Sequence, residues 1–363
     1  MGQDVRRSEE VTDRLEDLPP SSKFVYTVLQ YNGRLSQKEI IEETMLAPRT
    51  TRYALSQLEE EGLVQSRPAL HDARQICYAP AARDINETGY ANDVLIDAGW
   101  IADNVDVVRN DDSDIRLVQI PTDDGGEERI PGSVQIQEIV SADRRGIIDS
   151  GRLEAVLGEQ GIGPDTSIIL YSADKNKMAA YAYWTLSYYG HRDLYLLNGG
   201  FDAWLADGRD VVRTDPSLTP REYNISGTLE GIRAYRNDVV RALTQDTTIL
   251  DVRSPSEHKS DESTGQSNMD QPEGYIPGAI NVPWFEMLDE DGQFRPRSEL
   301  ARLFEEHGVD PDKPVIVYCS VGKRSALVWF VLQELLRYAE VTNYDGSWIE
   351  WGHLVDVPIE REP

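Results

Sequence analysis

A repeat within this 363-residue chain limits its possible folds more than any other feature of the sequence. Short motifs recur at a spacing of 146 to 147 residues: Ile130-Pro131-Gly132 matches Ile276-Pro277-Gly278, and Ile168-Ile169-Leu170-Tyr171 matches Val315-Ile316-Val317-Tyr318. Each copy alternates short apolar runs with segments of helical pattern, which is typical of a parallel sheet with helices on both faces. The sequence therefore predicts two α/β domains of similar fold in tandem.

Cys319 lies where one of these apolar runs meets a helical segment in the second copy. Residues 314–318 precede it, and Ser320-Val321-Gly322-Lys323-Arg324-Ser325 follows. Ligands of open parallel sheets bind at the carboxyl ends of strands, and N–H groups at a helix N-terminus favour a thiolate over a thiol. We therefore expect Cys319 to be a reactive thiol in an anion-binding loop. The alternative is a small buried core residue, as free cysteines often are.

The first copy lacks this chemistry. Ser172 stands opposite Cys319, in the loop Ser172-Ala173-Asp174-Lys175-Asn176-Lys177, and Pro121 falls opposite Arg253 when the preceding strands are aligned. A serine nucleophile would need a neighbouring base held by an orienting group, and no such arrangement is recognisable near Ser172. We expect the first copy to be catalytically silent.

Three further motifs of the second copy belong with the cysteine loop. They are Asp251-Val252-Arg253-Ser254-Pro255-Ser256-Glu257, Gly274-Tyr275-Ile276-Pro277-Gly278-Ala279 and Asn343-Tyr344-Asp345-Gly346-Ser347-Trp348. With them, and with four residues between Cys319 and Arg324, the second copy resembles the catalytic domain of rhodaneses, the thiosulfate sulfurtransferases. Tyr275 departs from the family pattern, where His is usual, and so does Ser320, where Arg or Lys is common. A silent first copy before an active second one resembles the tandem rhodaneses.

The resemblance implies a reaction through a Cys319 persulfide. Sulfane sulfur would pass from thiosulfate or a similar donor to cyanide or a thiol acceptor, without a cofactor or a metal. The resemblance implies these donor-binding residues: Arg253, Ser320, Val321, Gly322, Lys323 and Arg324. It gives Asp251 and Glu257 a supporting role. The two cations after Gly322 favour thiosulfate over 3-mercaptopyruvate. A Cys–His hydrolase is a weaker alternative, because none of the five histidines lies in a recognised motif near Cys319.

The first 83 residues have a different pattern. Apolar residues at helical spacing after Pro19-Pro20-Ser21-Ser22 predict one helix with a serine cap, and Ser36-Gln37-Lys38-Glu39 is a capping box that predicts a second. Pro48 begins a third helix that Glu61-Gly62 ends, and residues 63–66 and 75–78 predict two short strands. Three helices and a hairpin of this size resemble a winged helix-turn-helix domain of α+β type.

That resemblance implies DNA binding through residues 18–82. Arg49, Thr50 and Arg52 of the third helix would enter a major groove, and the hairpin, with Arg67, His71 and Arg74, would touch phosphates. The alternative is a winged helix used for protein contacts or dimerisation. Cys77 is expected to be a packed strand residue, rather than a redox sensor, since no cation cluster or second cysteine accompanies it.

These features divide the chain into a polar tail (1–17), the winged-helix domain (18–82), a linker (81–92), the silent copy (93–210), a second linker (211–232) and the catalytic copy (233–363). Residues 259–273 are expected to form a surface loop beside the active site. With these assignments, the chain as a whole could be a sulfurtransferase, or alternatively a DNA-binding regulator that senses sulfur species.

Charge and composition bear on where such a protein works. The net charge is −28, and 29 of the 36 basic residues are arginine, which is typical of a high-salt, haloarchaeal cytoplasm, where screening makes self-repulsion cheap. The first 83 residues carry a net charge of only −2. No apolar run is long enough to span a membrane, and two cysteines in separate domains do not suggest disulfides, so we expect a cytoplasmic location.

Overall fold

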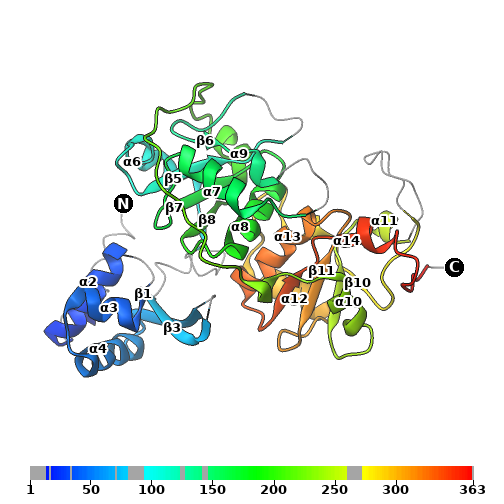
Figure 1. Ribbon diagram of the computed structural model, residues 1–363, viewed down its shortest axis with the longest axis horizontal. Helices are drawn as coiled ribbons and strands as arrows, with labels where there is room; N and C mark the ends of the chain where they lie inside the picture. The colour runs from blue at the N-terminus through cyan, green and yellow to red at the C-terminus, as the bar shows by residue number, and fades with distance from the viewer. Residues whose placement is uncertain are drawn as a thin grey trace. The chain divides into compact units, whose positions relative to one another are not determined.

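The computed structural model describes residues 14–15, 18–32, 35–69, 72–80, 94–122, 127–140, 146–259 and 272–361 (Figure 1). These residues fall into two compact units, Met1–Asn86 and Glu87–Pro363. The first unit has its own hydrophobic core, formed around Val25, Leu29, Leu55 and Leu58. The second unit contains both copies of the repeat.

Within its described residues, the first unit has three helices with defined bounds and a three-stranded antiparallel sheet of order β1-β3-β2, and residues 14–15 are also helical. Its elements are α2 (Pro20–Asn32), β1 (Leu35–Ser36), α3 (Gln37–Thr44), α4 (Pro48–Glu60), β2 (Val64–Ala69) and β3 (Asp72–Pro80). The three predicted helices and the hairpin are confirmed, while β1 was not expected. The two hairpin strands are also longer than predicted.

Local signals explain where these helices begin and end. The Ser36 hydroxyl accepts a hydrogen bond from the Glu39 N–H at 3.2 Å and the Glu39 carboxylate accepts one from the Ser36 N–H at 2.6 Å, so the predicted capping box is present. Pro48 is the first residue of α4. The predicted serine cap of α2 is wrong, because that helix already begins at Pro20 and Ser22 lies within it. Phe24, expected among the apolar face of α2, is 46% exposed.

The first copy of the repeat is built on a five-stranded parallel sheet of order β4-β8-β7-β5-β6. Its elements are β4 (Leu95–Ile96), α5 (Ala98–Asp103), α6 (Val105–Arg109), β5 (Ile115–Gln119), β6 (Val134–Gln135), η1 (Glu138–Val140), α7 (Ser150–Glu159), β7 (Ser167–Tyr171), α8 (Lys177–Tyr188), β8 (Leu194–Leu197) and α9 (Gly200–Ala206).

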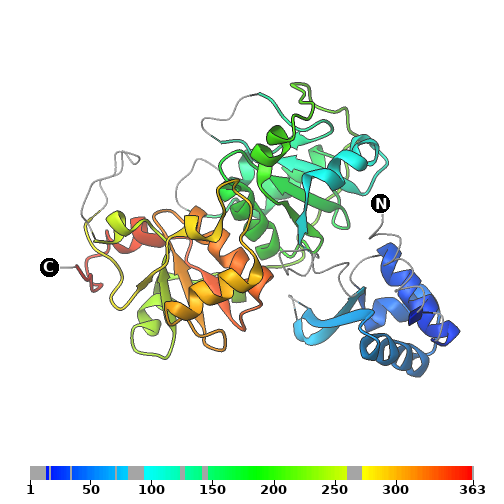
Figure 2. The same cartoon turned by 180° about the vertical axis from the view of Figure 1, so that it is seen from behind.

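The second copy has a four-stranded parallel sheet of order β10-β9-β11-β12. Its elements are η2 (Glu230–Ile232), α10 (Arg236–Ala242), β9 (Thr248–Asp251), α11 (Pro255–Lys259), β10 (Ile280–Asn281), η3 (Trp284–Met287), α12 (Arg297–Glu306), β11 (Val315–Tyr318), α13 (Lys323–Phe330), the π-helical segment η4 (Val331–Leu336), β12 (Val341–Asn343) and α14 (Ser347–Trp351). Figure 1 and Figure 2 show helices on both faces of each sheet, so the predicted α/β architecture is confirmed.

The two copies are equivalent strand for strand. In the first copy, the edge strand β4 pairs with β8. At the equivalent edge of the second copy, a single parallel bridge joins Arg233 to Asn343 of β12. The hydroxyl of Tyr171 accepts a hydrogen bond from the Ile130 N–H at 2.9 Å, and that of Tyr318 accepts one from the Ile276 N–H at 3.2 Å. The repeat read from the sequence is therefore a repeat of structure.

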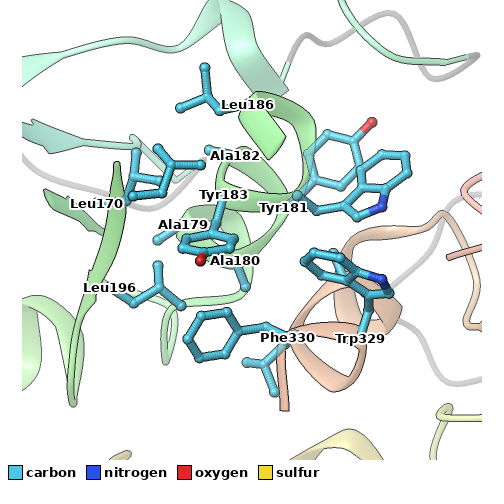
Figure 3. Close-up of a cluster of buried hydrophobic side chains, with 14 of the residues drawn as sticks. Leu170, Ala179, Ala180, Tyr181, Ala182, Tyr183, Leu186, Leu196, Trp329 and Phe330 are labelled. Atoms are coloured by element: carbon cyan, nitrogen blue, oxygen red, sulfur yellow. The ribbon is translucent and has the colours of Figure 1, made fainter. Parts of the chain in front are cut away.

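A shared core joins the two copies within the second unit. Helix α8 packs on helix α13: the Tyr183 ring meets Phe330 edge-on at 4.9 Å between centroids and lies 6.5 Å from Trp329 (Figure 3). Every residue of α8 from Ala179 to Tyr188 is buried. The two domains therefore stabilise each other through one continuous hydrophobic cluster.

Candidate active site

Cys319 directly follows β11, a strand buried along its whole length between β9 and β12. Helix α13 begins four residues later, and Gly322 is its N-cap, with φ +85°. A Cβ at position 322 would lie 2.6 Å from the carbonyl oxygen of Asp345. The loop therefore needs glycine at this position for both its backbone conformation and its close approach to Asp345.

The segment around α14 holds the cysteine loop from one side. The Cys319 N–H donates to the Ser347 hydroxyl at 3.1 Å, and the Cys319 carbonyl accepts from the Trp348 N–H at 2.9 Å. The Ser320 carbonyl accepts from the Ile349 N–H at 3.0 Å. These contacts assign a positioning role to Ser347, which sequence reasoning quoted only as part of a motif.

The Cys319 sulfur is fully buried and receives hydrogen bonds. The Gly322 N–H donates to the sulfur at 3.2 Å, and the Ser325 hydroxyl also donates to the sulfur, at 3.7 Å. Burial alone would raise the pKa of this thiol, but the positive charge of Arg324 and hydrogen bonds from the backbone of Ser325 and Val321 outweigh it. The pKa of Cys319 is therefore lowered, which favours the nucleophilic thiolate.

Glu257 holds the predicted donor-binding residue Arg324. Its two carboxylate oxygens accept hydrogen bonds from the guanidinium nitrogens of Arg324, each at 2.7 Å. The Ser320 hydroxyl donates to the same carboxylate at 2.9 Å and accepts from Arg324. Burial opposes the negative charge of Glu257, but these contacts with Arg324 prevail and lower its pKa to about 2. Glu257 thus holds the Arg324 side chain, and its supporting role in sulfur transfer stays a prediction.

Arg253 lies in a second network, centred on the fully buried Asp251. Its guanidinium contacts the Asp251 carboxylate and donates to the Gly274 carbonyl at 2.9 Å. It also lies 4.8 Å from the centre of the Trp348 ring. These contacts make Arg253 part of the packing behind the loop, and donor binding by its side chain stays a prediction.

Two residues that sequence reasoning missed complete this network. His258 Nδ1 and the Tyr318 hydroxyl both lie 2.9 Å from Asp251 Oδ2. His258 stacks on Tyr275, at 4.0 Å between ring centres. Tyr318 immediately precedes Cys319, so the network reaches the loop through the backbone. The position of Tyr318 next to Cys319 was a signal in the sequence that could have indicated its role. No comparable signal pointed to His258, which lies seven residues after Asp251.

The other predicted loop residues lie as expected for a turn into a helix. Val321 and Lys323 are half-buried, and Lys323 is the first residue of α13. Most of the insertion predicted at 259–273 lies outside the described residues. Its described end at Pro272 accepts a hydrogen bond from the Trp348 indole N–H at 2.8 Å, so that end lies next to α14.

The loop of the first copy that corresponds to the cysteine loop contains a carboxyl group of its own, Asp174, whose pKa is raised by burial. The Asp174 carboxylate accepts hydrogen bonds from the Ser172 hydroxyl at 2.6 Å and from the Met178 N–H at 3.3 Å, in the first turn of α8. Lys177 lies 3.8 Å from the other Asp174 oxygen. Gln119 takes the position of Asp251 in this copy. Gln119 pairs with Tyr171 at the end of β7, just as Asp251 pairs with Tyr318 at the end of β11. The first copy thus lacks the thiol and fills the helix N-terminus with a carboxylate.

A cavity of about 540 Å³ lies elsewhere in the second unit. Five carboxylates contribute to its lining: Asp97, Asp202, Asp207, Glu290 and Asp291. Cys319 does not line it. Because this lining would repel an anionic sulfur donor, the cavity is not part of the candidate active site.

The predicted DNA-binding residues lie on α4 of the first unit. Arg49 and Arg52 are exposed and Thr50 is half-buried, while Thr51, Ala54, Leu55 and Leu58 face the core. Tyr53, which sequence reasoning did not select, is 56% exposed beside them. His71 and the side chains of Arg67, Arg74 and Cys77 lie outside the described part of the structure.

Among the described residues, no helix is both long enough and apolar enough to cross a membrane. Within the same ranges, no cluster of three or more His, Cys, Asp or Glu side chains is arranged to hold a metal ion.

Comparison with known proteins places both units. Residues 109–207 and 236–354 match the rhodanese-like domain, and residues 25–65 match a winged helix-turn-helix DNA-binding family. A Haloferax volcanii protein provisionally named a thiosulfate sulfurtransferase is 38% identical over 287 residues, which are 76% of this chain and 99% of that protein. The sulfur carrier protein TtuD of Thermus thermophilus is 37% identical over 289 residues, 75% of this chain and 99% of its own length.

Solved structures share the fold of the second unit at lower identity. EanB matches with a TM-score of 0.65 and 21% identity, over 76% of this chain and 72% of EanB. YnjE matches with a TM-score of 0.65 and 23% identity, over 74% of this chain and 68% of YnjE. From the family match, the sequence relatives and the loop geometry, the chain belongs to the rhodanese family of sulfurtransferases, as a tandem of two rhodanese-like domains preceded by a winged helix-turn-helix domain.

Proposed function

We propose that this chain transfers sulfane sulfur from thiosulfate or a similar donor, through a persulfide on Cys319, to cyanide or a thiol acceptor. The observation that carries the proposal is the environment of one sulfur atom. Cys319 lies in the loop between β11 and α13, receives hydrogen bonds from Gly322 and Ser325, and has its pKa lowered chiefly by Arg324 against the effect of burial.

The proposed reaction follows from that environment. The Cys319 thiolate attacks the outer sulfur of thiosulfate, the sulfur–sulfur bond breaks, and sulfite leaves with the electron pair. The new persulfide anion takes the place of the thiolate beside the same N–H and O–H donors. An acceptor nucleophile then attacks the outer sulfur and releases the Cys319 thiolate, so the cycle needs no oxidant or reductant.

Mass spectrometry of the intact protein tests the proposal. After treatment with thiosulfate, the wild-type chain should gain the mass of one sulfur atom and lose it again with cyanide. Cys319→Ser should abolish both the mass gain and sulfur transfer. Cys77→Ser is the matched control, because it removes the other of the two cysteines. This variant should keep both the mass gain and sulfur transfer. Retained transfer in Cys319→Ser would refute the proposal.

A second candidate function is DNA-binding regulation, and the surface of α4 favours it. Arg49 and Arg52 project from the exposed face of a helix in a domain that matches a DNA-binding family. Such side chains read base edges when the helix lies in a major groove. In this reading the rhodanese domains sense sulfur species and modulate the affinity for an operator.

Selection of bound duplexes from a random pool by the full-length chain, at high salt, tests the second candidate. One enriched sequence family is expected, and Arg49→Ala should weaken binding to it. An unenriched pool would favour a winged helix used for protein contacts or dimerisation. Deletion of residues 1–83 should leave sulfur transfer unchanged, since Cys319 and its partners lie in the second unit.

A further inference from the structure

The positive charges of the cysteine loop are largely offset by carboxylates. Arg324, whose charge acts directly on the Cys319 sulfur, is bound at both terminal nitrogens by Glu257. The pKa of Glu257 is lowered to about 2, against the effect of burial, so the carboxylate is ionised at neutral pH. The Arg324–Glu257 pair therefore has no net charge.

Arg253 is neutralised in the same way. Its side chain is 3% exposed and that of its partner Asp251 is fully buried. This second pair lies behind the loop, in contact with Trp348, and also has no net charge. Lys323 adds one formal positive charge at the start of α13, and the helix N-terminus adds a fractional one.

Ser320 directly follows Cys319 and is a neutral residue in this loop. Its hydroxyl donates to Glu257 and accepts from Arg324, so the side chain turns toward the ion pair and brings no charge. Ser320 is 7% exposed and Cys319 is fully buried, so dissolved salt screens charges at this site only weakly.

The donor must approach a thiolate in these surroundings. Thiosulfate carries two negative charges, which with the thiolate makes three at the moment of transfer. An organic persulfide, R–S–SH, carries at most one, which makes two or fewer. Like charges at close range repel strongly where the effective dielectric constant is low, and beyond its two neutral ion pairs this loop supplies at most about one formal positive charge, that of Lys323.

We propose, building on the sulfurtransferase function above, that the preferred donor is an organic persulfide of low charge and that Ser320 determines this preference. The Cys319 thiolate attacks the outer sulfur of R–S–SH and forms a new sulfur–sulfur bond. The donor's own sulfur–sulfur bond breaks, and its electron pair leaves on R–S⁻. The proton of the transferred sulfur passes to R–S⁻, so the products are a thiol and the Cys319 persulfide anion. No oxidant or reductant is consumed.

The test compares two donors on the same preparation of full-length protein, so that differences in active fraction cancel. Rates of Cys319 persulfide formation are measured by mass spectrometry with thiosulfate and with 2-hydroxyethyl persulfide. Each rate is divided by the rate of that donor with a small free thiol. The wild-type chain should prefer the persulfide at least tenfold after this correction.

Variants then locate the preference. Ser320→Arg, or Ser320→Lys if the larger side chain prevents folding, should shift the donor ratio toward thiosulfate at least tenfold. Ala173→Arg is the matched control, because it places the same charge at the equivalent position of the silent loop and should leave the ratio unchanged.

Equal or better use of thiosulfate by the wild-type chain would overturn the inference, and so would an unchanged ratio in both Ser320 variants. Persulfide formation on Cys319 in those outcomes would leave the proposed function standing. If neither donor modifies Cys319, the proposed function fails, and this inference fails with it.

Discussion

Replacing Glu257 by glutamine should destabilise the catalytic domain in a way that depends on pH. The carboxylate accepts hydrogen bonds from both terminal nitrogens of Arg324, from the Ser320 hydroxyl, and from the N–H and hydroxyl of Ser254. Its pKa falls from 4.5 to about 2 on folding, because these partners outweigh the cost of burial. This lowering of the Glu257 pKa corresponds to about 3 kcal/mol of folding free energy at neutral pH.

The direction of the pH effect follows from the sign of this shift. A carboxyl group whose pKa is depressed in the folded protein stabilises it fully above the unfolded value, and the contribution disappears as pH falls toward the folded value. Glu257→Gln should therefore lower the free energy of unfolding by about 3 kcal/mol at pH 7. The difference from wild type should shrink to about 1.4 kcal/mol at pH 3.

Urea titrations of both proteins at several pH values measure this difference. Glu306→Gln is the matched control: it removes an exposed glutamate from an ion pair with Arg302, in which both side chains are about two-thirds exposed, and should cost at most about 0.5 kcal/mol. A loss below about 1 kcal/mol for Glu257→Gln at pH 7, or a loss that does not shrink in acid, would refute the reasoning.

Three further substitutions probe the loop and the winged helix. Gly322→Ala should cost about 1–3 kcal/mol of stability, because residue 322 has φ +85° and a Cβ there would lie 2.6 Å from the Asp345 carbonyl oxygen; normal unfolding by urea would contradict this. Arg324→Ala should reduce kcat/KM for sulfur transfer about tenfold or more and raise the pH at which Cys319 is alkylated, whereas Lys175→Ala in the silent loop should change neither. Equal effects of Arg324→Ala and Lys175→Ala would contradict the assignment of catalysis to the second copy. Arg49→Ala should weaken binding of a selected duplex by about 1–3 kcal/mol, measured by titration at high salt, and unaltered affinity would remove this side chain from base recognition.

Features set by short stretches of sequence could be predicted well. The capping box at Ser36, the helix start at Pro48 and the turn from β11 through Gly322 into α13 each depend on neighbouring residues, so a local pattern was enough. The tandem α/β fold could be predicted because the same order of apolar runs occurs twice. Strand β1 escaped notice because two residues carry no detectable alternation, and its pairing partners Cys77 and Tyr78 lie about 40 positions away.

The contacts between ionisable groups could not be predicted in the same way. Glu257 and Arg324 are 67 positions apart, and so are Asp251 and Tyr318. Only the pairing of β9 with β11 brings them together. The sequence indicated that Arg253 belongs near the site, but it could not tell whether the side chain turns toward the sulfur or toward Asp251. Nor could it show that the Asp174 carboxyl group turns toward Ser172 and the first turn of α8, because that depends on the conformation of one side chain.

The packing of α8 against α13 bears on why a copy without the thiol is retained. Trp329 and Phe330 of the second copy would meet water if the first copy were absent, because Tyr183 and its buried neighbours on α8 cover them. The two copies thus resemble two subunits carried on one chain, because each covers part of the hydrophobic surface of the other. The aromatic surface of α8 therefore gives the first copy a structural role that is independent of any chemistry at Ser172. We therefore expect a fragment that contains the second copy alone, residues 233–363, to be prone to aggregate.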